Sequence, residues 1–356
     1  MPNLPKIAVF TLGGTIASSS RPSTDTAATV VLDGAALLSA VPEAADLADL
    51  EVFSPLMVPS GDLQMHDVLS LRVAILEAVA AGADGVVVTQ GTDTLEETSF
   101  ALDVMLALDT PVVFTGAMRI ASSPGADGPA NLLGAIRVAA SSGARGLGVL
   151  VVLNDEIHSA RYVRKSHTSS LATFTSPMCL AVGYISEDRV RVLSVPKGRL
   201  NVPVPFDAAT VSVGHITITF DDSGRFLESA AELGFQGLVI AGMGGGHVPG
   251  RIAPKVIRLA HRIPVVLASR TGAGETMRST YGYLGSETHL LPNGVISAGN
   301  LSPLKAGILL RLLLMAGVRR DELTWCFEQA SDPDGVVVTR ASARSGLRSR
   351  VSRRPA

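Results

Sequence analysis

Residues 85–98 read GVVVTQGTDTLEET, and this segment is the most informative about the fold. Its β-branched start predicts a buried strand. Thr94 followed three residues later by Glu97 has the pattern of a capping box, which predicts that a helix begins there. Thr92 and Asp93 therefore lie between a strand and a helix, where the free N–H groups of the helix favour an oxyanion. In open α/β sheets, ligands bind at this edge.

A second stretch, residues 11–17, reads TLGGTIA and places another hydroxyl, that of Thr15, after another predicted strand. Threonine is a poor nucleophile until a base removes its proton. Lys165 is a candidate base if the fold brings it to Thr92 and Asp93, because partial burial makes a lysine easier to deprotonate and a carboxylate holds it in place. One threonine would then attack a carbonyl group while the other relays a proton. Each motif alone is usually a turn and a helix cap, and only their joint placement after strands indicates a catalytic site.

The order of the predicted elements indicates an α/β fold with two domains. In the larger N-terminal domain, strands alternate with helices at a spacing typical of a doubly wound parallel sheet. The strands expected there are 6–12, 51–59, 86–89, 111–115 and 148–153, and the helices are 34–40, 66–81, 94–108 and 131–140. In a smaller C-terminal α/β domain, the strands are 216–220, 237–241 and 264–268, and the helices are 229–233 and 302–316.

Changes in composition predict the domain boundaries. We expect an N-terminal catalytic domain at 1–195, a linker at 196–213 and a C-terminal domain at 214–339. Residues 340–356 are rich in arginine without an apolar period, which predicts a disordered tail. Residues 17–31 are polar and follow the candidate nucleophile, so they are either a lid over the site or a plain surface loop.

The composition excludes several classes of protein. Hydrophobic residues make up 47% of the chain and charged residues 17%, as in α/β proteins with buried strands. The formal net charge of −2 gives no reason to expect nucleic acid or another polyanion as a partner. No apolar run is long enough to span a membrane and no signal-peptide pattern opens the chain, so we expect no membrane partner and a cytoplasmic location.

No pattern in the sequence predicts a cofactor or a metal. Cys179 and Cys326 are the only cysteines, too few for a disulfide framework or a zinc ribbon. The seven histidines are not paired at metal-ligand spacing. Residues 242–247 begin like a dinucleotide loop but have His247 at the third glycine position, and residues 12–15 lack the end of a P-loop.

Residues 11–17 and 89–98 together resemble the two signature segments of the bacterial-type L-asparaginase family, the asparaginase/glutaminase family. Further matching segments, in the family's order, are GAMR at 116–119, ADGPANL at 126–132, LND at 153–155 and AGNLSP at 298–303. The resemblance covers roughly residues 6–330. Two long motifs at such a separation are far more specific than either of them alone.

The resemblance implies that the protein hydrolyses L-asparagine to L-aspartate and ammonia through a covalent acyl-enzyme, without a cofactor. Thr15 matches the nucleophile of the family. Thr92, Asp93 and Lys165 match the threonine, aspartate and lysine that form its proton-handling triad. The family fold implied is a larger N-terminal α/β domain with a smaller C-terminal one.

Substrate-binding positions follow from the same resemblance. The residues implied are Ser60, Gly61, Gly91, Thr92, Asp93 and Ala117. Ser60 and Gly61 match positions that hold the α-carboxylate and α-amino groups, and the carbonyl of Ala117 matches one that meets the amide. The main-chain N–H groups near the two threonines would form an oxyanion hole, typically worth about a hundredfold in rate.

Active sites of this family lie between subunits, so the resemblance implies a homodimer or homotetramer with shared sites. His247 stands where the family often has an asparagine that reaches into a neighbour's site. The spacing favours Glu287 over Glu275 as the glutamate that the neighbouring subunit contributes.

The chain departs from the family pattern close to the chemistry. The family's lid tyrosine, which orients the nucleophile, has no match: the first tyrosine is Tyr162, and Ala27 stands in the lid position. Gln90 stands where histidine is common, which predicts a tuned site and not a lost one. Gly61 replaces a polar side chain and so weakens recognition of the amino group.

Three other functions remain open. One is a glutaminase-asparaginase or another hydrolase of small amides, since the sequence does not define the length of the pocket. The second is a non-catalytic protein that binds an amino acid or a partner, although such a protein has no need of Lys165. The third, an amidase subunit of a tRNA-dependent amidotransferase, lacks the expected extra N-terminal domain.

Overall fold

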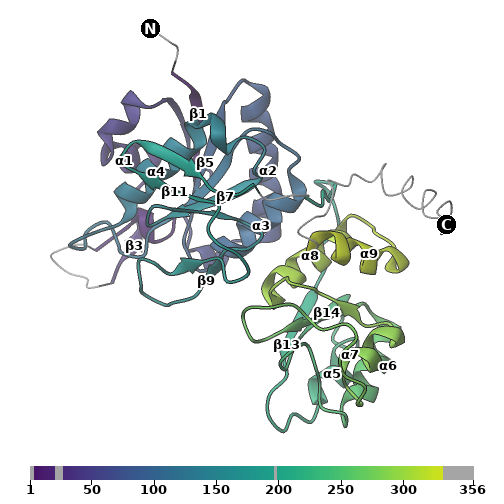
Figure 1. Ribbon diagram of the computed structural model, residues 1–356. Coiled ribbons are helices and arrows are strands. Elements are labelled where there is room, and N and C mark those ends of the chain that lie inside the picture. The colour runs from purple at the N-terminus through teal and green to yellow at the C-terminus, as the bar shows by residue number, and fades with distance from the viewer. Residues whose placement is uncertain (1–3, 21–26, 196–198, 332–356) are drawn as a thin grey trace, which may run out of the picture. The chain divides into compact units, whose positions relative to one another are not determined.

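The structure, a computed structural model of the 356-residue chain, describes residues 4–20, 27–195 and 199–331. The chain divides into two compact units, residues 1–196 and 197–356 (Figure 1). Each unit contains its own β-sheet with helices on both sides. The predicted tail at 340–356 and part of the predicted loop at 17–31 lie outside the described residues.

The first unit is built on an eight-stranded sheet in the order β12-β11-β8-β7-β6-β5-β1-β4. Its parallel strands are β4 (Asp49–Phe53), β1 (Lys6–Thr11), β5 (Gly85–Thr89), β6 (Val112–Thr115) and β7 (Val149–Leu153). The antiparallel strands are β8 (Glu156–Ser159), β11 (Gly183–Ser186) and β12 (Arg189–Val192). The predicted α/β class is confirmed, but the sheet is mixed and not wholly parallel.

The change of direction in the sheet has a local cause. Asn154 and Asp155 form the two-residue connection between β7 and β8, and both have left-handed φ angles, 52° and 61°. Two such residues make the tight turn of a β-hairpin, which returns the chain antiparallel to itself.

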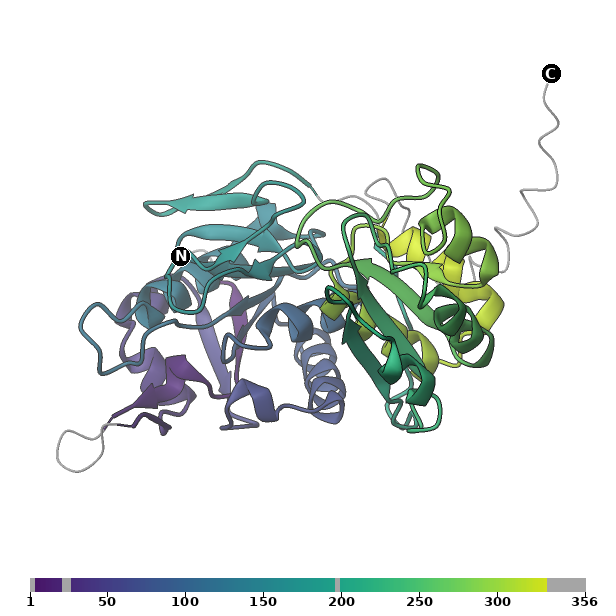
Figure 2. The ribbon, with the colours of Figure 1, turned by 90° about the horizontal axis from the view of Figure 1, so that it is seen from below.

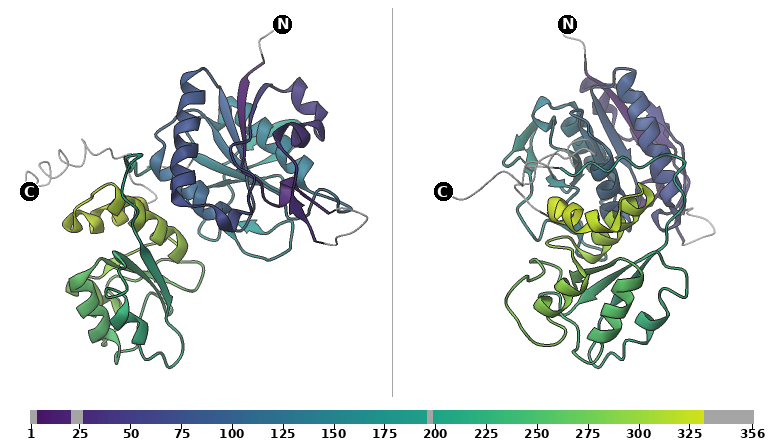
Figure 3. Two further views of the ribbon diagram at one scale, coloured as in Figure 1. Left: turned by 180° about the vertical axis from the view of Figure 1, so that it is seen from behind. Right: turned by 90° about the vertical axis from the view of Figure 1, so that its right-hand side faces the viewer.

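Helices cover both faces of the large sheet (Figure 3). They are α1 (Gly34–Ser39), α2 (Met65–Ala80), α3 (Leu95–Met105) and α4 (Gly128–Ala140). Alternate strand residues such as Val9, Val87 and Val113 form one core with Leu132 and Ile136 of α4. The residues of β5 alternate between the two faces of the sheet. Since both faces are covered, the whole of β5 is buried, as its β-branched run predicts.

The parallel strands, taken in chain order, have the arrangement 2-1-3-4-5 of a doubly wound sheet. In such sheets the direction of winding reverses beside the first strand, and a ligand crevice opens there at the carboxyl ends. The reversal falls between β1 and β5, the two strands that precede Thr15 and Thr92. Topology therefore places the two predicted threonines at the same point.

Several predicted boundaries differ from the observed ones. The strand expected at 51–59 ends at Phe53, and the helix expected at 131–140 begins at Gly128, with Pro129 in its first turn. After β1, the described residues form the short antiparallel pair β2 (Ser18–Ser19) and β3 (Thr29–Val30). Ser18 pairs with Val30 and Ser19 with Thr29, and the polar composition of this segment gave no strand pattern that would predict the pairing.

The second unit contains a four-stranded parallel sheet, β13 (Val213–Thr217), β14 (Gly237–Gly242), β15 (Val265–Ser269) and β16 (Ile296–Ser297) (Figure 2). Its helices are α5 (Arg225–Ser229), α6 (Ala253–Arg262), α7 (Glu287–Leu290), α8 (Pro303–Met315) and α9 (Arg320–Ser331). The predicted helix at 229–233 is wrong in position, because α5 ends at Ser229. Likewise β13 stops short of Phe220, which is 93% exposed.

No helix within the described residues is long and apolar enough to cross a membrane. In the same part of the chain, no group of three or more His, Cys, Asp or Glu side chains could hold a metal ion.

Candidate active site

Two glycine turns bring the predicted site together. Gly13 and Gly14 follow β1 with φ angles of 96° and 83°, a conformation that L side chains rarely adopt. A Cβ atom on Gly14 would lie only 2.2 Å from the Cα atom of Gly91. The main chains of the two turns therefore touch, which places Thr15 beside the turn that contains Thr92.

A third turn joins the first two. Ser60 begins the 3₁₀ turn η3 (Ser60–Asp62) and is buried. A Cβ atom on Gly91 would meet the Ser60 hydroxyl oxygen at 2.8 Å. The neighbouring Gly61 has open space around its Cα, with no atom within 4 Å of a Cβ built there. Ser60, Gly61, Gly91 and Thr15 thus lie at one edge of the sheet.

The predicted proton-handling residues are in direct contact. The Nζ atom of Lys165 lies 3.0 Å from Oγ1 of Thr92 and 2.6 Å from Oδ1 of Asp93. Thr92 is 5% exposed and the Lys165 side chain 18%, whereas the Asp93 side chain is 80% exposed. Asp93 is thus open to an incoming ligand while Thr92 and Lys165 lie behind it.

The predicted capping box at the start of α3 is wrong. Thr94 is the N-cap residue, but its side chain makes no capping hydrogen bond. The Thr94 hydroxyl instead donates to the main-chain carbonyl of Ser60 at 2.9 Å and accepts from Nε2 of Gln90 at 3.2 Å. The buried Gln90 in turn accepts from Thr98 at 2.8 Å. These bonds tie the Ser60 turn to α3, and this tertiary contact displaces the local cap.

The loop that contains Ala117 is held by α4. Asp127 accepts the main-chain N–H of Met118 at 2.9 Å. The side-chain amide of Asn131 donates to the carbonyl of Gly116 and to Asp127, both at 3.0 Å. Ala117 itself is fully buried. The segment 126–132 therefore fixes the backbone at the position predicted to meet the substrate amide.

Comparison with known proteins identifies the family of the chain. The protein-family model described as "Asparaginase, N-terminal" matches residues 6–197. The one described as "Glutaminase/Asparaginase C-terminal domain" matches residues 212–327. The chain belongs to the asparaginase family.

Relatives in the asparaginase family match over most of the chain. A Haemophilus influenzae protein named probable L-asparaginase periplasmic is 35% identical over 319 residues, 88% of this chain and 89% of that one. L-asparaginase 2 of Escherichia coli is 32% identical over 332 residues, 92% of this chain and 93% of that one. The crystal structure of a probable cytoplasmic L-asparaginase from Campylobacter jejuni matches with a TM-score of 0.83 and 31% identity, covering 91% of this chain and 99% of that one.

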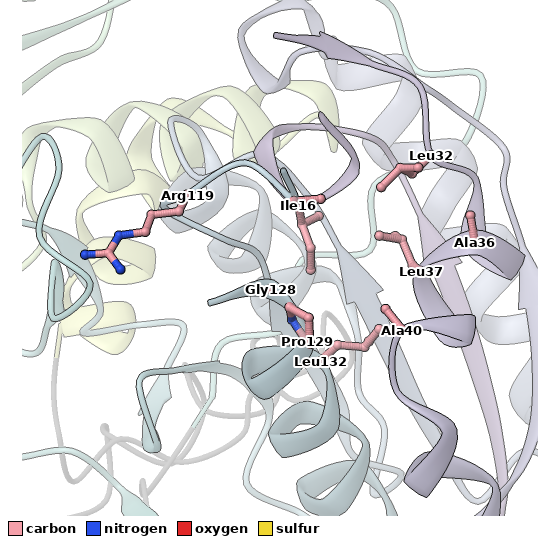
Figure 4. A pocket seen from close by; sticks show the side chains of 10 residues that line it. Ile16, Leu32, Ala36, Leu37, Ala40, Arg119, Gly128, Pro129 and Leu132 are labelled. Atoms are coloured by element: carbon pink, nitrogen blue, oxygen red, sulfur yellow. The ribbon is translucent and has the colours of Figure 1, made fainter. Parts of the chain in front are cut away.

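Ile16 anchors the turn that bears the candidate nucleophile of this asparaginase-family chain. It is 3% exposed and lies against Leu32, Leu37 and Leu132 in an apolar pocket, from which Arg119 extends away (Figure 4). This contact holds the main chain next to Thr15. Within the described residues, neither the hydroxyl nor the main-chain N–H of Thr15 donates a hydrogen bond to a protein group. Ala27, in the family's lid position, is exposed.

In the second unit, His247 and Glu287 contact each other. Nε2 of His247 lies 3.0 Å from Oε2 of Glu287, and Nδ1 lies 2.9 Å from the hydroxyl of Tyr283. The other carboxylate oxygen of Glu287 accepts main-chain N–H groups from Thr280 and Tyr281 at 2.5 and 2.6 Å. Since the Glu287 side chain has no exposed surface, any role at a second site would act through His247 or Tyr283.

The surroundings of Glu287 and Tyr283 shift the pKa values of both side chains. Burial alone would raise the pKa of Glu287, but the N–H groups of Tyr281 and Thr280 and the His247 ring outweigh it, and the pKa lies below its ordinary value. Burial, followed by the nearby Glu287 and Tyr281, raises the pKa of Tyr283. The cluster therefore pairs an ionised carboxylate with a protonated phenol at neutral pH. Glu275, the alternative to Glu287, is exposed.

Several residues that support the site were not predicted from the sequence. Asp127 and Asn131 lie in the segment 126–132 that matches the family, but the sequence pattern marked Asn131 only as the start of a helix and gave Asp127 no role. Glu96 is one residue of the second signature and no sequence pattern distinguishes it, yet it is 4% exposed and accepts a hydrogen bond from the main chain of Lys165. A buried carboxylate inside a signature was the signal available.

Proposed function

We propose that this chain is an L-asparaginase, an amidohydrolase that converts L-asparagine to L-aspartate and ammonia. The observation that carries the proposal is the double contact of Lys165 Nζ with Thr92 and Asp93, beside the turn of Thr15. The Thr15 oxygen attacks the side-chain amide carbon, and its proton passes to the Thr92–Lys165 pair. The amide nitrogen takes up a proton and leaves as ammonia, and water then hydrolyses the ester to release aspartate.

Main-chain donors support the transition state in this mechanism. Within the part of the chain that the structure describes, the N–H groups of Thr15 and Thr92 donate to no other protein group. Both remain free to bind the oxyanion, and one such donor is typically worth about a hundredfold in rate. Ser60 and Gly61 would hold the α-carboxylate and amino groups, Asp93 the amine, and the Ala117 carbonyl the amide nitrogen.

The assembly and the location belong to the same proposal. We take the active form to be a homodimer or homotetramer with shared sites, to which the His247–Glu287 pair of a neighbouring copy contributes through the Tyr283 hydroxyl. One relative is named periplasmic and one cytoplasmic, and we propose the cytoplasm for this chain.

A second candidate function is binding without catalysis. The exposed Ala27 in the lid position and the absence of any tyrosine before Tyr162 favour it, because no phenol of this segment can orient Thr15. Hydrolysis of glutamine or another small amide is the nearest catalytic alternative.

The experiment that separates these functions measures ammonia release by the purified protein from L-asparagine and from L-glutamine, with Thr15→Ala alongside. We expect release from asparagine that disappears in the variant. Release from glutamine at an equal or higher kcat/KM would replace asparaginase by glutaminase-asparaginase. A folded protein that binds asparagine without releasing ammonia would be the non-catalytic member.

A further inference from the structure

Lys165 lies on a short strand, and the pairing of this strand with its neighbour does not use the main-chain N–H of Lys165. The strand β9 (Arg164–Lys165) pairs antiparallel with β10 (Phe174–Thr175), and Lys165 stands opposite Phe174. The ladder continues through the N–H of Ser166, which donates to the carbonyl of Thr173 at 2.8 Å. The N–H of Lys165 takes no part in this ladder.

A buried carboxylate takes up this free N–H. Oε2 of Glu96 accepts it at 2.5 Å across 69 residues of sequence. Glu96 is only 4% exposed, and a buried carboxylate is unfavourable unless it accepts hydrogen bonds. Glu96 therefore attaches the strand of Lys165 to the first turn of α3, directly after Thr92 and Asp93.

The helix dipole alone does not explain a glutamate at this position. Acidic side chains in the first turn stabilise any helix start, and Glu97 stands in that turn as well. Glu97 is partly exposed, whereas Glu96 is buried against the main chain of Lys165. The difference between them is the contact to the candidate base.

We propose that Glu96 is the positioning residue for Lys165: through the main-chain bond at residue 165 it sets the reach of Nζ to Thr92 and Asp93. The inference rests on the proposed function, in which Lys165 handles the proton of the reaction. A displacement of about 1 Å at a reacting group can cost up to about a hundredfold in rate. Loss of the bond at Glu96 therefore reduces the chemical step while substrate binding by the Ser60 turn persists.

Asp103 provides a matched control on the same helix. It is 3% exposed, and its Oδ1 accepts the main-chain N–H of Val149 at 2.9 Å. The type of bond, the burial and the helix are the same, but the strand held is β7, which bears none of the proposed catalytic residues.

The test compares kcat, KM and thermal unfolding of Glu96→Ala, Asp103→Ala, Glu96→Gln and Lys165→Met. We expect Glu96→Ala to lower kcat about tenfold to a hundredfold with KM changed by less than about threefold. Asp103→Ala should lower the Tm comparably but keep kcat. Glu96→Gln should recover much of kcat, because its amide oxygen still accepts the N–H of Lys165.

The outcomes test the positioning role of Glu96 separately from the proposed catalytic role of Lys165. If Lys165→Met abolishes turnover but Glu96→Ala keeps wild-type kcat, or if Asp103→Ala loses as much kcat as Glu96→Ala, the positioning role is overturned and the site assignment stands. If Lys165→Met itself keeps kcat, the proposed mechanism fails first. Should the alanine variants not fold, Glu96→Gln against Asp103→Asn makes the same comparison, with a smaller loss of kcat expected only for Glu96→Gln.

Discussion

At the scale of single residues, the site is a set of short polar contacts on a rigid backbone. Lys165 touches both a hydroxyl and a carboxylate, and the carboxylate is the exposed member. The exposure of Asp93 in front of Thr92 and Lys165 suits a relay in which Thr92 and Lys165 exchange a proton while Asp93 faces the substrate. All the groups that we propose to react lie in the first unit, and the group that would orient Thr15 is the one that we expect from a neighbouring copy.

Lys165→Met tests the relay directly. Removing a general base typically costs about a hundredfold to ten-thousandfold in rate, so we expect nearly all turnover to disappear while the fold persists. The measurement is steady-state ammonia release together with circular dichroism. Lys255→Met is the control, since Lys255 bonds the Ser223 carbonyl in the second unit and should keep wild-type kcat. Wild-type kcat in Lys165→Met would refute the triad.

Glu287 makes stability depend on pH. Its pKa is lowered in the folded state, so its contribution is complete above the ordinary value of 4.5 and is lost as the pH falls through the lower folded value. We expect Glu287→Gln to unfold at a lower urea concentration than wild type at pH 7. The difference between the two urea midpoints should become smaller below about pH 4. A difference in urea midpoint that stays constant from pH 7 to about pH 3 would contradict a contribution of the Glu287 carboxylate to stability.

At the scale of elements, the site depends on turns that follow parallel strands. The turns after β1 and β5 pack glycine against glycine, and α3 and α4 hold the loops of Ser60 and Ala117. Each turn is positioned by a helix N-terminus or by a neighbouring turn. The precision of the site therefore depends on backbone contacts as much as on the side chains proposed to be catalytic.

Gly14→Ala should disrupt this arrangement. Its φ of 83° is strained for alanine, and the new Cβ would lie 2.2 Å from Cα of Gly91. We expect a loss of stability of at least about 2 kcal/mol and the loss of most activity, measured by urea unfolding and ammonia release. Gly282→Ala is the control, because nothing lies within 4 Å of its Cβ. Equal stability of the two variants would show that the turns do not need this close approach.

At the scale of the whole molecule, the question is how many copies make an active enzyme. The first unit contains the proposed triad, and the second contains the Tyr283–His247–Glu287 cluster. Tyr283 is 50% exposed and its hydroxyl contacts His247, which the buried Glu287 holds in place, as expected for a group offered to another site. A shared site would also supply a phenol, which residues 17–31 do not contain.

We therefore expect activity to require assembly. Sedimentation at decreasing protein concentration should show a dimer or tetramer, and specific activity should fall as the assembly dissociates. Tyr283→Phe, which retains the ring but loses the hydroxyl, should leave the assembly intact. A monomer with full activity would exclude the shared site.

Much of this protein was predictable from local sequence. Val86–Val88 are β-branched and lie in a buried strand, and the glycines and threonines after two strands mark the turns of the site. Strand propensity and turn chemistry are properties of a few neighbouring residues, so the pattern alone reports them. The α/β class, the first four helices and the two threonine motifs follow from such patterns.

Other features depended on what lies beside an element in space. Thr94 bonds the carbonyl of Ser60 in place of its own helix, and Glu96 bonds the strand of Lys165, because those partners are presented by distant parts of the chain. The antiparallel pairs formed by β8, β11 and β12 were likewise not predicted, because an alternation of strands and helices does not indicate which strands pair. The residue types along the chain suffice to name the threonines, the aspartate and the lysine as candidates for amide hydrolysis. Which of these side chains meet depends on the folded chain, since hydrogen-bond partners and burial are set by packing across 34 to 73 residues of chain.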